Sequence, residues 1–449
     1  MLKDEQIQLL NILKESLHGK AYELPHMDND SFVRLMKLSE MHQVLPLVCE
    51  SIYQSVSLKE SRIFHAYKQH AIVSAAMQKV KIDEFLEMQK LMQEAGLDPI
   101  VVKGTVCQFL YPKAYLRTSI DDDLFVPDEQ FNACHRFLLD YGLVPDYPVS
   151  DLDAADEISY HKEDSTLYVE LHRSLFPTNS DAYGRLNRFF DKAQEHTVQI
   201  QAEDAAIRTL CPTDHFLYLI LHTFKHFLHS GIGIRPVCDI GMFADHYYEE
   251  IDWAYIKECL VTANAYDYTR ALLHIIDRYL LPGTAYLSSI VDWNITAVEV
   301  EPMLEDILES GVHGASSMSR LHSSNITLSA AADSSKNGIL QSIFLPLKNM
   351  EGQYPYLKKA PFLLPYAWVQ RIVTYVKETR TSQSSSYGGV STGWVKVSYM
   401  KTRFCSVDNS LIVKLKYNIS KSNKKTINNF YSSMGTSWVR QNTSQGILV

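Results

Sequence analysis

Apolar residues recur every three or four positions through the first 96 residues, which is the spacing of a helix face. The stretch "NDSFVRLMKLSEMHQVLPLVCESIYQS" (29–55) also opens with Asn, Asp and Ser, residues that favour a helix start. A longer helix is predicted from about Leu58 to Ala95, where "AGLDP" supplies the glycine and proline that end helices. Residues 1–96 are therefore predicted to form an N-terminal helical region.

The pattern changes after this region. "PIVV" (99–102) and "DLFV" (123–126) are short apolar runs, and the first leads through "KGT" into a short predicted helix. A further helix is predicted over 128–141, and the alternation over 157–176, around the turn-like "KEDS", predicts a hairpin. Strands interleaved with helices indicate a small α/β core, which we assign to residues 97–205.

The helical pattern returns from residue 212 to about 281, and a C-terminal helical domain is expected over 206–379. Within it, 308–325 is Gly/Ser-rich and predicted to be a loop, and 355–378 is an apolar helix or helix pair broken by prolines. Residues 380–449 are rich in Ser, Thr and Asn and carry ten Lys/Arg against one acid. Such a tail can touch nucleic acid or an acidic partner, but is more often solvated and poorly ordered.

Composition narrows the class of protein. The 449 residues are 46% hydrophobic and 21% charged, as in ordinary globular proteins, and the net charge of −9 gives no argument for nucleic acid or anionic membrane. The chain starts without the apolar segment of a secretory signal, and its apolar runs are too short to cross a bilayer. Seven scattered cysteines without a CxxC pair fit a reducing compartment, so we expect a cytoplasmic protein.

Three consecutive acids interrupt an apolar run in "SIDDDLFV" (119–126). If the run is a strand, Asp121 and Asp123 share one face and Asp122 points to the other. Two carboxylates on one face form a site for a hard divalent cation such as Mg²⁺. A solvated acidic turn is the alternative on spacing alone.

Residues upstream and downstream of the acids favour a binding site for metal and phosphate over a solvated turn. Gly104 follows a predicted strand, where a glycine lets the backbone approach a phosphate closely. Downstream, Glu170 interrupts the apolar strand "TLYVELH", and His172 lies two residues on, on the same face. A role as third metal ligand would explain the glutamate, and a salt bridge or an edge strand with that face in water is the alternative.

In order along the chain, these residues resemble the uncharacterised nucleotidyltransferase family of the DNA polymerase beta-like nucleotidyltransferase superfamily. The resemblance covers roughly residues 30–380. The matching elements are Lys103-Gly104, Tyr111-Pro112, Arg117, Asp121, Asp123 and Glu170-Leu171-His172. Two features depart from the pattern: Gly104-Thr105 stands in place of a Gly-Ser pair, and Asp122 stands where the family usually has an apolar residue.

The resemblance implies a two-metal transfer of a nucleoside monophosphate from an NTP. Asp121 and Asp123 would hold Mg²⁺ against the triphosphate, and Glu170 would complete the second metal site and help activate the acceptor hydroxyl. Nucleotide binding is implied for four residues upstream of the acids: Lys103, Gly104, Thr105 and Arg117.

Five other residues are candidates for the wall of the cleft: His172, His222, His226, Arg235 and Asp239. We expect His172 to hydrogen-bond a metal ligand. His222 and His226 lie one helical turn apart, a spacing that suits zinc, a nucleotide-facing helix or ordinary half-buried histidines. Arg235 and Asp239 are four residues apart and can form a simple ion pair.

The predicted fold class is α/β (α+β), a small mixed-sheet nucleotidyltransferase core flanked by helical regions. The expected partners are an NTP, two Mg²⁺ ions and an unknown hydroxyl-bearing acceptor, either a small molecule or a protein side chain. Neither a membrane nor nucleic acid is expected. A non-catalytic nucleotide-binding protein and a metal-dependent phosphohydrolase are the alternatives.

Overall fold

The computed structural model describes most of the first 311 residues and two short later segments. The described residues are 2–149, 151–153, 155–180, 183–311, 347–350 and 354–370. The predicted tail over 380–449, most of the predicted loop over 308–325 and the end of the predicted helix pair over 355–378 lie outside them.

Helices make up the N-terminal region, as predicted. They are α1 (Asp4–Ser16), α2 (Asn29–Met41), α3 (Leu45–Ile52) and α4 (Arg62–Glu94), with a 3₁₀ turn at Val56–Leu58. The Asp28 carboxylate caps α2 by accepting the Ser31 N–H. The apolar pattern over 29–55 belongs to two helices, because the chain turns at Gln43, where φ is 55°, and Pro46 lies in the first turn of the next helix.

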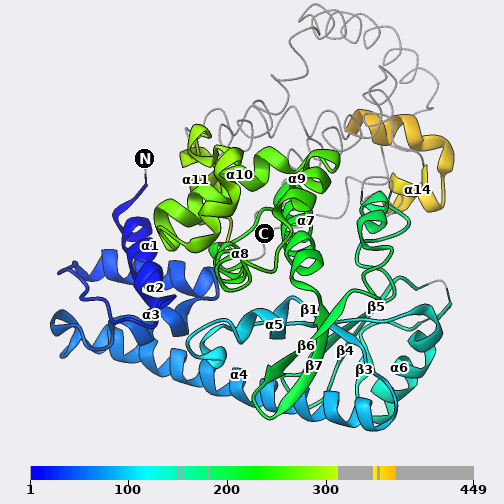
Figure 1. The fold of residues 1–449 in the computed structure, drawn as a ribbon, viewed down its shortest axis with the longest axis horizontal. Coiled ribbons are helices and arrows are strands. Elements are labelled where there is room, and N and C mark those ends of the chain that lie inside the picture. The colour runs from blue at the N-terminus through cyan, green and yellow to red at the C-terminus, as the bar shows by residue number, and fades with distance from the viewer. Residues whose placement is uncertain are drawn as a thin grey trace, which may run out of the picture. The chain divides into compact units, whose positions relative to one another are not determined.

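A five-stranded mixed sheet forms the centre of the core, which confirms the predicted fold class (Figure 1). Its strands are β1 (Ile100–Val102), β2 (Asp122–Phe125), β3 (Val144–Pro145), β4 (Glu157–His161) and β5 (Tyr168–His172), in the order β1-β2-β5-β4-β3. Only the central β2 and β5 run parallel, and their register sets Asp123 beside Glu170. Two short helices follow the first two strands: α5 (Gly104–Gln108) and α6 (Asp128–Asp140).

A second hairpin, β6 (Thr197–Ala202) and β7 (Ala205–Leu210), was not expected from the sequence. It lies beside β1, where the Thr209 hydroxyl donates to the Val101 carbonyl at 2.7 Å. Along β6 the apolar Val198, Ile200 and Ala202 alternate with Gln199 and Gln201, so the local pattern carries a strand signal that was missed.

Helices return from residue 212, as predicted. They are α7 (Pro212–His229), α8 (Ile234–His246), α9 (Trp253–Thr262), α10 (Tyr266–Ile275), the π-helical turn Ile276–Leu280, the 3₁₀ segment Ala285–Trp293 and α11 (Glu301–Ser310). None of the described helices is both long and apolar enough to cross a membrane.

One continuous hydrophobic core joins these helices to the sheet and to the N-terminal region. The domain limits drawn from the sequence stay predictions. Farther along the described chain, α14 (Leu347–Met350), two 3₁₀ turns and a helix over 364–370 follow.

A buried ion pair fixes α8 against the turn that precedes β2. Arg117 reaches Asp239 through two bonds, Nη2 to Oδ2 at 2.6 Å and Nε to Oδ1 at 3.1 Å. The Tyr111 hydroxyl donates to the same Oδ1 at 2.8 Å. Because both charged side chains are buried, this network orients one wall of the molecule toward the acids of β2.

His42 joins three segments that are distant in sequence. Its Nε2 donates to the Leu308 carbonyl at 3.1 Å, and its Nδ1 accepts the Ile234 N–H at 3.2 Å. These partners require a neutral imidazole protonated at Nε2. Burial lowers the pKa of His42 to about 4.

The free energy of unfolding is therefore expected to fall more between pH 7.5 and pH 5 in the wild type than in His42→Gln, by about 2 kcal/mol. The unfolded state takes up a proton near the ordinary pKa of 6.5, which the folded state excludes until about pH 4. Urea unfolding at several pH values measures the difference. His26→Gln, at an exposed histidine, should keep the wild-type slope. Equal slopes for the wild type and His42→Gln would contradict the prediction.

Candidate active site

The acids of "SIDDDLFV" lie where β2 begins. Asp123 is fully buried, and Asp121, directly before the strand, keeps a third of its side chain exposed. The Lys103 ammonium stands between them, 3.0 Å from Asp123 Oδ2 and 3.4 Å from Asp121 Oδ2. The predicted alternation of faces is present, since Asp122 contacts a different set of residues.

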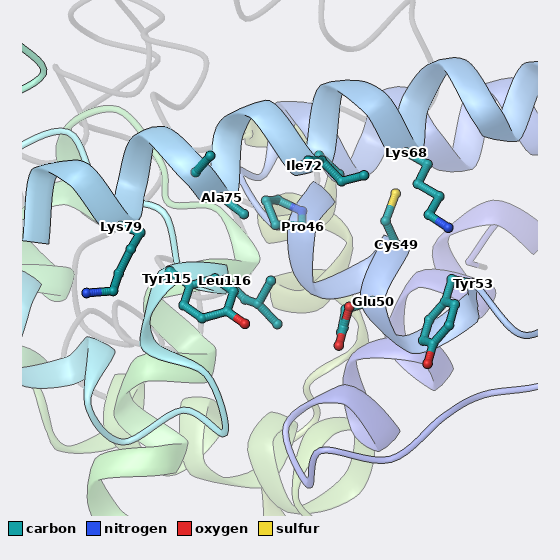
Figure 2. A pocket seen from close by; sticks show the side chains of 12 residues that line it. Pro46, Cys49, Glu50, Tyr53, Lys68, Ile72, Ala75, Lys79, Tyr115 and Leu116 are labelled. Atoms are coloured by element: carbon teal, nitrogen blue, oxygen red, sulfur yellow. The ribbon is translucent and has the colours of Figure 1, made fainter.

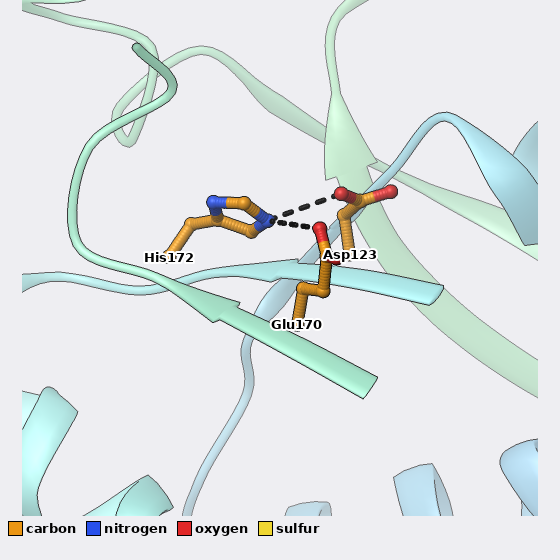
Figure 3. A group of neighbouring side chains, drawn as sticks. All are labelled: Asp123, Glu170 and His172. Carbon is orange, nitrogen blue, oxygen red and sulfur yellow. Dashed lines mark hydrogen bonds and ion pairs between the residues drawn. The ribbon is translucent and has the colours of Figure 1, made fainter. Parts of the chain in front are cut away.

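Glu170 and His172 on β5 converge on Asp123 from the neighbouring strand, as Figure 3 shows. His172 Nε2 lies 3.1 Å from Asp123 Oδ1 and 3.5 Å from Glu170 Oε2. One ligand atom from each of the three residues falls within 4.8 Å of the others. Among the residues that the structure describes, this is the group suited to hold a metal ion.

Charges in this cluster are mutually compensated. Attraction to Lys103 holds the pKa of Asp121 well below its usual range, whereas burial raises the pKa of Glu170. Burial disfavours the charged form of His172, but its bonds to Asp123 and Glu170 outweigh this and raise its pKa to about 9. Without a metal, one ammonium and one imidazolium thus offset two of the three negative charges, and burial makes the third acid, Glu170, easier to protonate.

Lys103 has a backbone conformation that usually requires glycine, with φ of 59° and ψ of −112°. Its N–H donates to Nε2 of His215 at 2.9 Å. Burial lowers the pKa of His215 to about 3, so this imidazole is a neutral acceptor. No local sequence pattern singles out His215, because its partner is 112 residues away.

Gly104 follows in this turn and packs against the strand of acids. A Cβ at this position would lie 2.9 Å from the Asp121 carbonyl oxygen and 3.3 Å from Asp122 Oδ1. The glycine is thus required by close backbone packing against β2. Thr105 is buried, and its hydroxyl donates to Asp122 Oδ1 at 2.6 Å. Its side chain therefore contacts the strand of acids and does not line the cleft.

Asp122 forms a buried ion pair with Lys81 of α4. The distance is 2.9 Å, and neither side chain is more than 3% exposed. Lys81 also donates to the Ile120 carbonyl at 2.8 Å, so it fixes the turn that carries Asp121. Lys81 was not among the residues expected at the site, although its place at helical spacing from the buried Gln78 and Phe85 is a usable signal.

A cavity of about 400 Å³ opens beside the acids. Nine of the twelve residues named from the sequence line it, and the remaining three, Thr105, Asp123 and His172, are buried side chains that do not. The nine are Lys103, Gly104, Arg117, Asp121, Glu170, His222, His226, Arg235 and Asp239. The structure thus brings the predicted residues to one place, and their roles stay predictions.

The helical wall of this cavity carries the two histidines and Arg235. His222 Nε2 lies 3.5 Å from the Lys103 ammonium and 3.2 Å from His226 Nε2. Burial, aided by Lys103, holds the pKa of His222 well below its usual range. No third ligand joins this pair into a zinc site among the described residues. Arg235 does not pair with Asp239, which Arg117 already binds, and donates instead to the Thr118 carbonyl at 2.7 Å.

A slightly larger hollow of about 470 Å³ lies between α3 and α4 (Figure 2). None of the residues named from the sequence lines it. Its potential nucleophile is Cys49, and burial raises the pKa of that thiol to about 12, which makes it unreactive. The hollow between α3 and α4 therefore lacks both a reactive thiol and the acids and histidines that line the cavity beside β2.

The model of the protein family described as "Uncharacterised nucleotidyltransferase" matches residues 28–280. This range is more than half of the chain and contains every residue of the site. The chain therefore belongs to this family of nucleotidyltransferases, which confirms the resemblance seen in the sequence. No curated protein and no solved structure matches the chain.

Replacing Lys81 by Met should lower the free energy of unfolding by about 3–5 kcal/mol, because it leaves the buried Asp122 carboxylate without a cation. The double variant Lys81→Met/Asp122→Asn should be more stable than Lys81→Met, since it removes the stranded charge as well. Urea unfolding of both variants and of Asp122→Asn measures the coupling.

Lys79→Met is the matched control for this pair. Lys79 lies two residues away on the exposed side of the same helix, so its loss should cost no more than about 1 kcal/mol. Additive effects of Lys81→Met and Asp122→Asn would show that the two side chains do not depend on each other.

Proposed function

We propose that the protein is a divalent-metal-dependent nucleotidyltransferase that moves a nucleoside monophosphate from an NTP to a hydroxyl-bearing acceptor. The observation that carries the proposal is that Asp121 and Asp123 flank the Lys103 ammonium beside the cavity, with Glu170 next to Asp123 on the neighbouring strand. Membership of the nucleotidyltransferase family supports the class of reaction.

The donor set suits a hard divalent cation. Carboxylate oxygens are the ligands that Mg²⁺ prefers, and the buried Asp123 Oδ2 is now contacted by a cation, the Lys103 ammonium, at 3.0 Å. Bound at Asp121, Asp123 and Glu170, two Mg²⁺ ions would neutralise charge on the triphosphate and on the attacking and leaving oxygens.

In the proposed reaction, the acceptor oxygen attacks the α-phosphorus, and the bond from that phosphorus to the β-phosphate oxygen breaks. Pyrophosphate leaves, and the proton of the acceptor hydroxyl passes to the Glu170 carboxylate, whose pKa is raised by burial. Lys103 and Arg235 are the cations proposed to contact the phosphates. Arg235 Nε has no hydrogen-bond partner among the described residues, and its pKa is lowered to about 10 by burial, so it gains from an anion.

The role that we propose for Arg117 differs from the nucleotide binding that the resemblance implies. Two of its nitrogens already bind Asp239, so we propose that it orients α8 and with it Arg235. Thr105 is likewise proposed to fix the turn through Asp122, and Gly104 to allow the close approach of that turn to β2.

A non-catalytic nucleotide-binding protein is the second candidate. One observation favours it: the Lys103 ammonium stands between Asp121 and Asp123, where the proposed reaction needs a metal ion. If Lys103 permanently replaced the ion, the wild type would bind an NTP analogue as tightly in EDTA as in Mg²⁺.

Asp123→Asn should lower nucleotidyl transfer by at least about a thousandfold, because it removes a buried charge shared by the proposed metal positions. The protein is incubated with Mg²⁺ and each α-labelled NTP, with a small-molecule extract or a protein extract as acceptor. Pyrophosphate release and transferred label are followed. Asp140→Asn, at the exposed end of α6, is the matched control.

Wild-type protein that neither releases pyrophosphate nor transfers label, or equal activity in Asp123→Asn, would overturn the proposed function. Metal-dependent release of orthophosphate without transferred label would identify a phosphohydrolase instead.

Lys103→Met should bind Mg²⁺ about tenfold more tightly in the absence of nucleotide, because the ammonium no longer competes for the two carboxylates. The same variant should bind a non-hydrolysable NTP more weakly, since a cation is lost from the cavity. Isothermal titration calorimetry measures both affinities. Weaker Mg²⁺ binding in this variant would contradict the proposed competition.

A further inference from the structure

The two oxygens of Asp123 face different surroundings. Oδ2 lies 3.0 Å from the Lys103 ammonium, which also contacts Asp121. Oδ1 lies 3.1 Å from Nε2 of His172, which is also 3.5 Å from Glu170 Oε2. A cation bound beside Oδ1 would therefore meet an imidazole nitrogen as well as carboxylate oxygens. A cation bound beside Oδ2 would instead have to take the place of the Lys103 ammonium.

We propose that His172 is itself a metal ligand, so that one ion of this site is held by Asp123, Glu170 and an imidazole nitrogen, and binds Mn²⁺ in preference to Mg²⁺. This inference rests on the proposed function and deepens it, because it concerns the ion that the reaction would use.

The spacing of the three donors supports direct ligation. In an octahedral complex with metal–ligand distances near 2.1 Å, neighbouring ligand atoms lie about 3.0 Å apart. The separations of His172 Nε2 from the two carboxylates, 3.1 and 3.5 Å, are close to that edge length. In the metal-free protein those contacts are hydrogen bonds, and ligation would replace the proton on Nε2.

Glu157 supplies the second observation, because ligating histidines commonly hold a carboxylate at their other ring nitrogen. It stands opposite His172 in the β4–β5 register, and its Oε2 lies 3.5 Å from His172 Nδ1. Glu157 therefore contacts the nitrogen that faces away from Asp123 and can orient the ring. Burial of His172, with only 8% of its side chain exposed, further restricts the ring.

Imidazole nitrogen changes the preference among metals. Mg²⁺ favours sites of oxygen and water alone, whereas Mn²⁺ and later divalent ions accept nitrogen. Replacing His172 by Gln offers an oxygen near the place of Nε2 and so keeps an all-oxygen site. The variant should lose more than about tenfold in Mn²⁺ affinity and little in Mg²⁺ affinity.

The test uses the full chain and Mn²⁺ without nucleotide. Paramagnetic resonance of free Mn²⁺ measures affinity, and pulsed measurements detect the hyperfine coupling of a directly bound ¹⁴N. The wild type should show nitrogen coupling, and His172→Gln should bind Mn²⁺ without it. Glu157→Gln should keep the coupling but weaken Mn²⁺ binding by about tenfold.

Two further variants serve as controls. His161→Gln changes an exposed histidine on β4, and His222→Gln removes the other histidine near Lys103. Both should keep the nitrogen coupling. Bound Mn²⁺ without nitrogen coupling in the wild type, coupling that persists in His172→Gln, or failure to bind Mn²⁺ would each overturn the inference.

Nucleotidyl transfer measured in parallel separates this inference from the proposed function. Transfer by a protein whose bound Mn²⁺ has no nitrogen neighbour would overturn the His172 ligand and leave the function intact. Nitrogen coupling in a protein without transfer would support the ligand and overturn the function.

Discussion

Neutralising three acids at the start of a buried strand is the constraint on which the rest of this structure depends. A buried carboxylate without a cation is costly, and three acids in succession, two of them buried on β2, cannot be left uncompensated. Two lysines meet the requirement from opposite faces, with Lys81 beside Asp122 and Lys103 between Asp121 and Asp123. The Lys81–Asp122 pair on one face therefore stabilises the fold. Lys103, Asp121 and Asp123 on the other face are the charged groups that a ligand could meet.

Each lysine requires support from elsewhere in the chain. Lys81 is positioned by α4, the long helix that also contacts the turn before β2. Lys103 is held in a conformation suited to glycine, and the bond from its N–H to the neutral His215 helps to maintain it. Strain of this kind persists only where the surroundings fix the backbone, and it is common at functional sites. The same turn needs a glycine at its next position because it packs against β2.

The helical region completes the site, although the acids belong to the sheet. The Arg117–Asp239 pair fixes α8, and α7 brings His222 to within 3.5 Å of the Lys103 ammonium. Anionic and cationic side chains thus border the same cavity, an arrangement that suits a metal–triphosphate complex. A family match over residues 28–280, which includes the helices on both sides of the sheet, agrees with this shared construction.

The sequence by itself determined the features that depend on local periodicity. Alternation along a strand separates Asp122 from its two neighbours and puts Glu170 and His172 on one face, and helical spacing predicts the helices on both sides of the core. Tertiary structure alone decided which cation each acid meets, because those partners come from segments whose separation no local pattern encodes. It also paired Asp239 with Arg117, 122 residues away, where four-residue spacing suggested Arg235. Burial explains both outcomes, since a charge removed from water takes whichever partner the packing brings within reach.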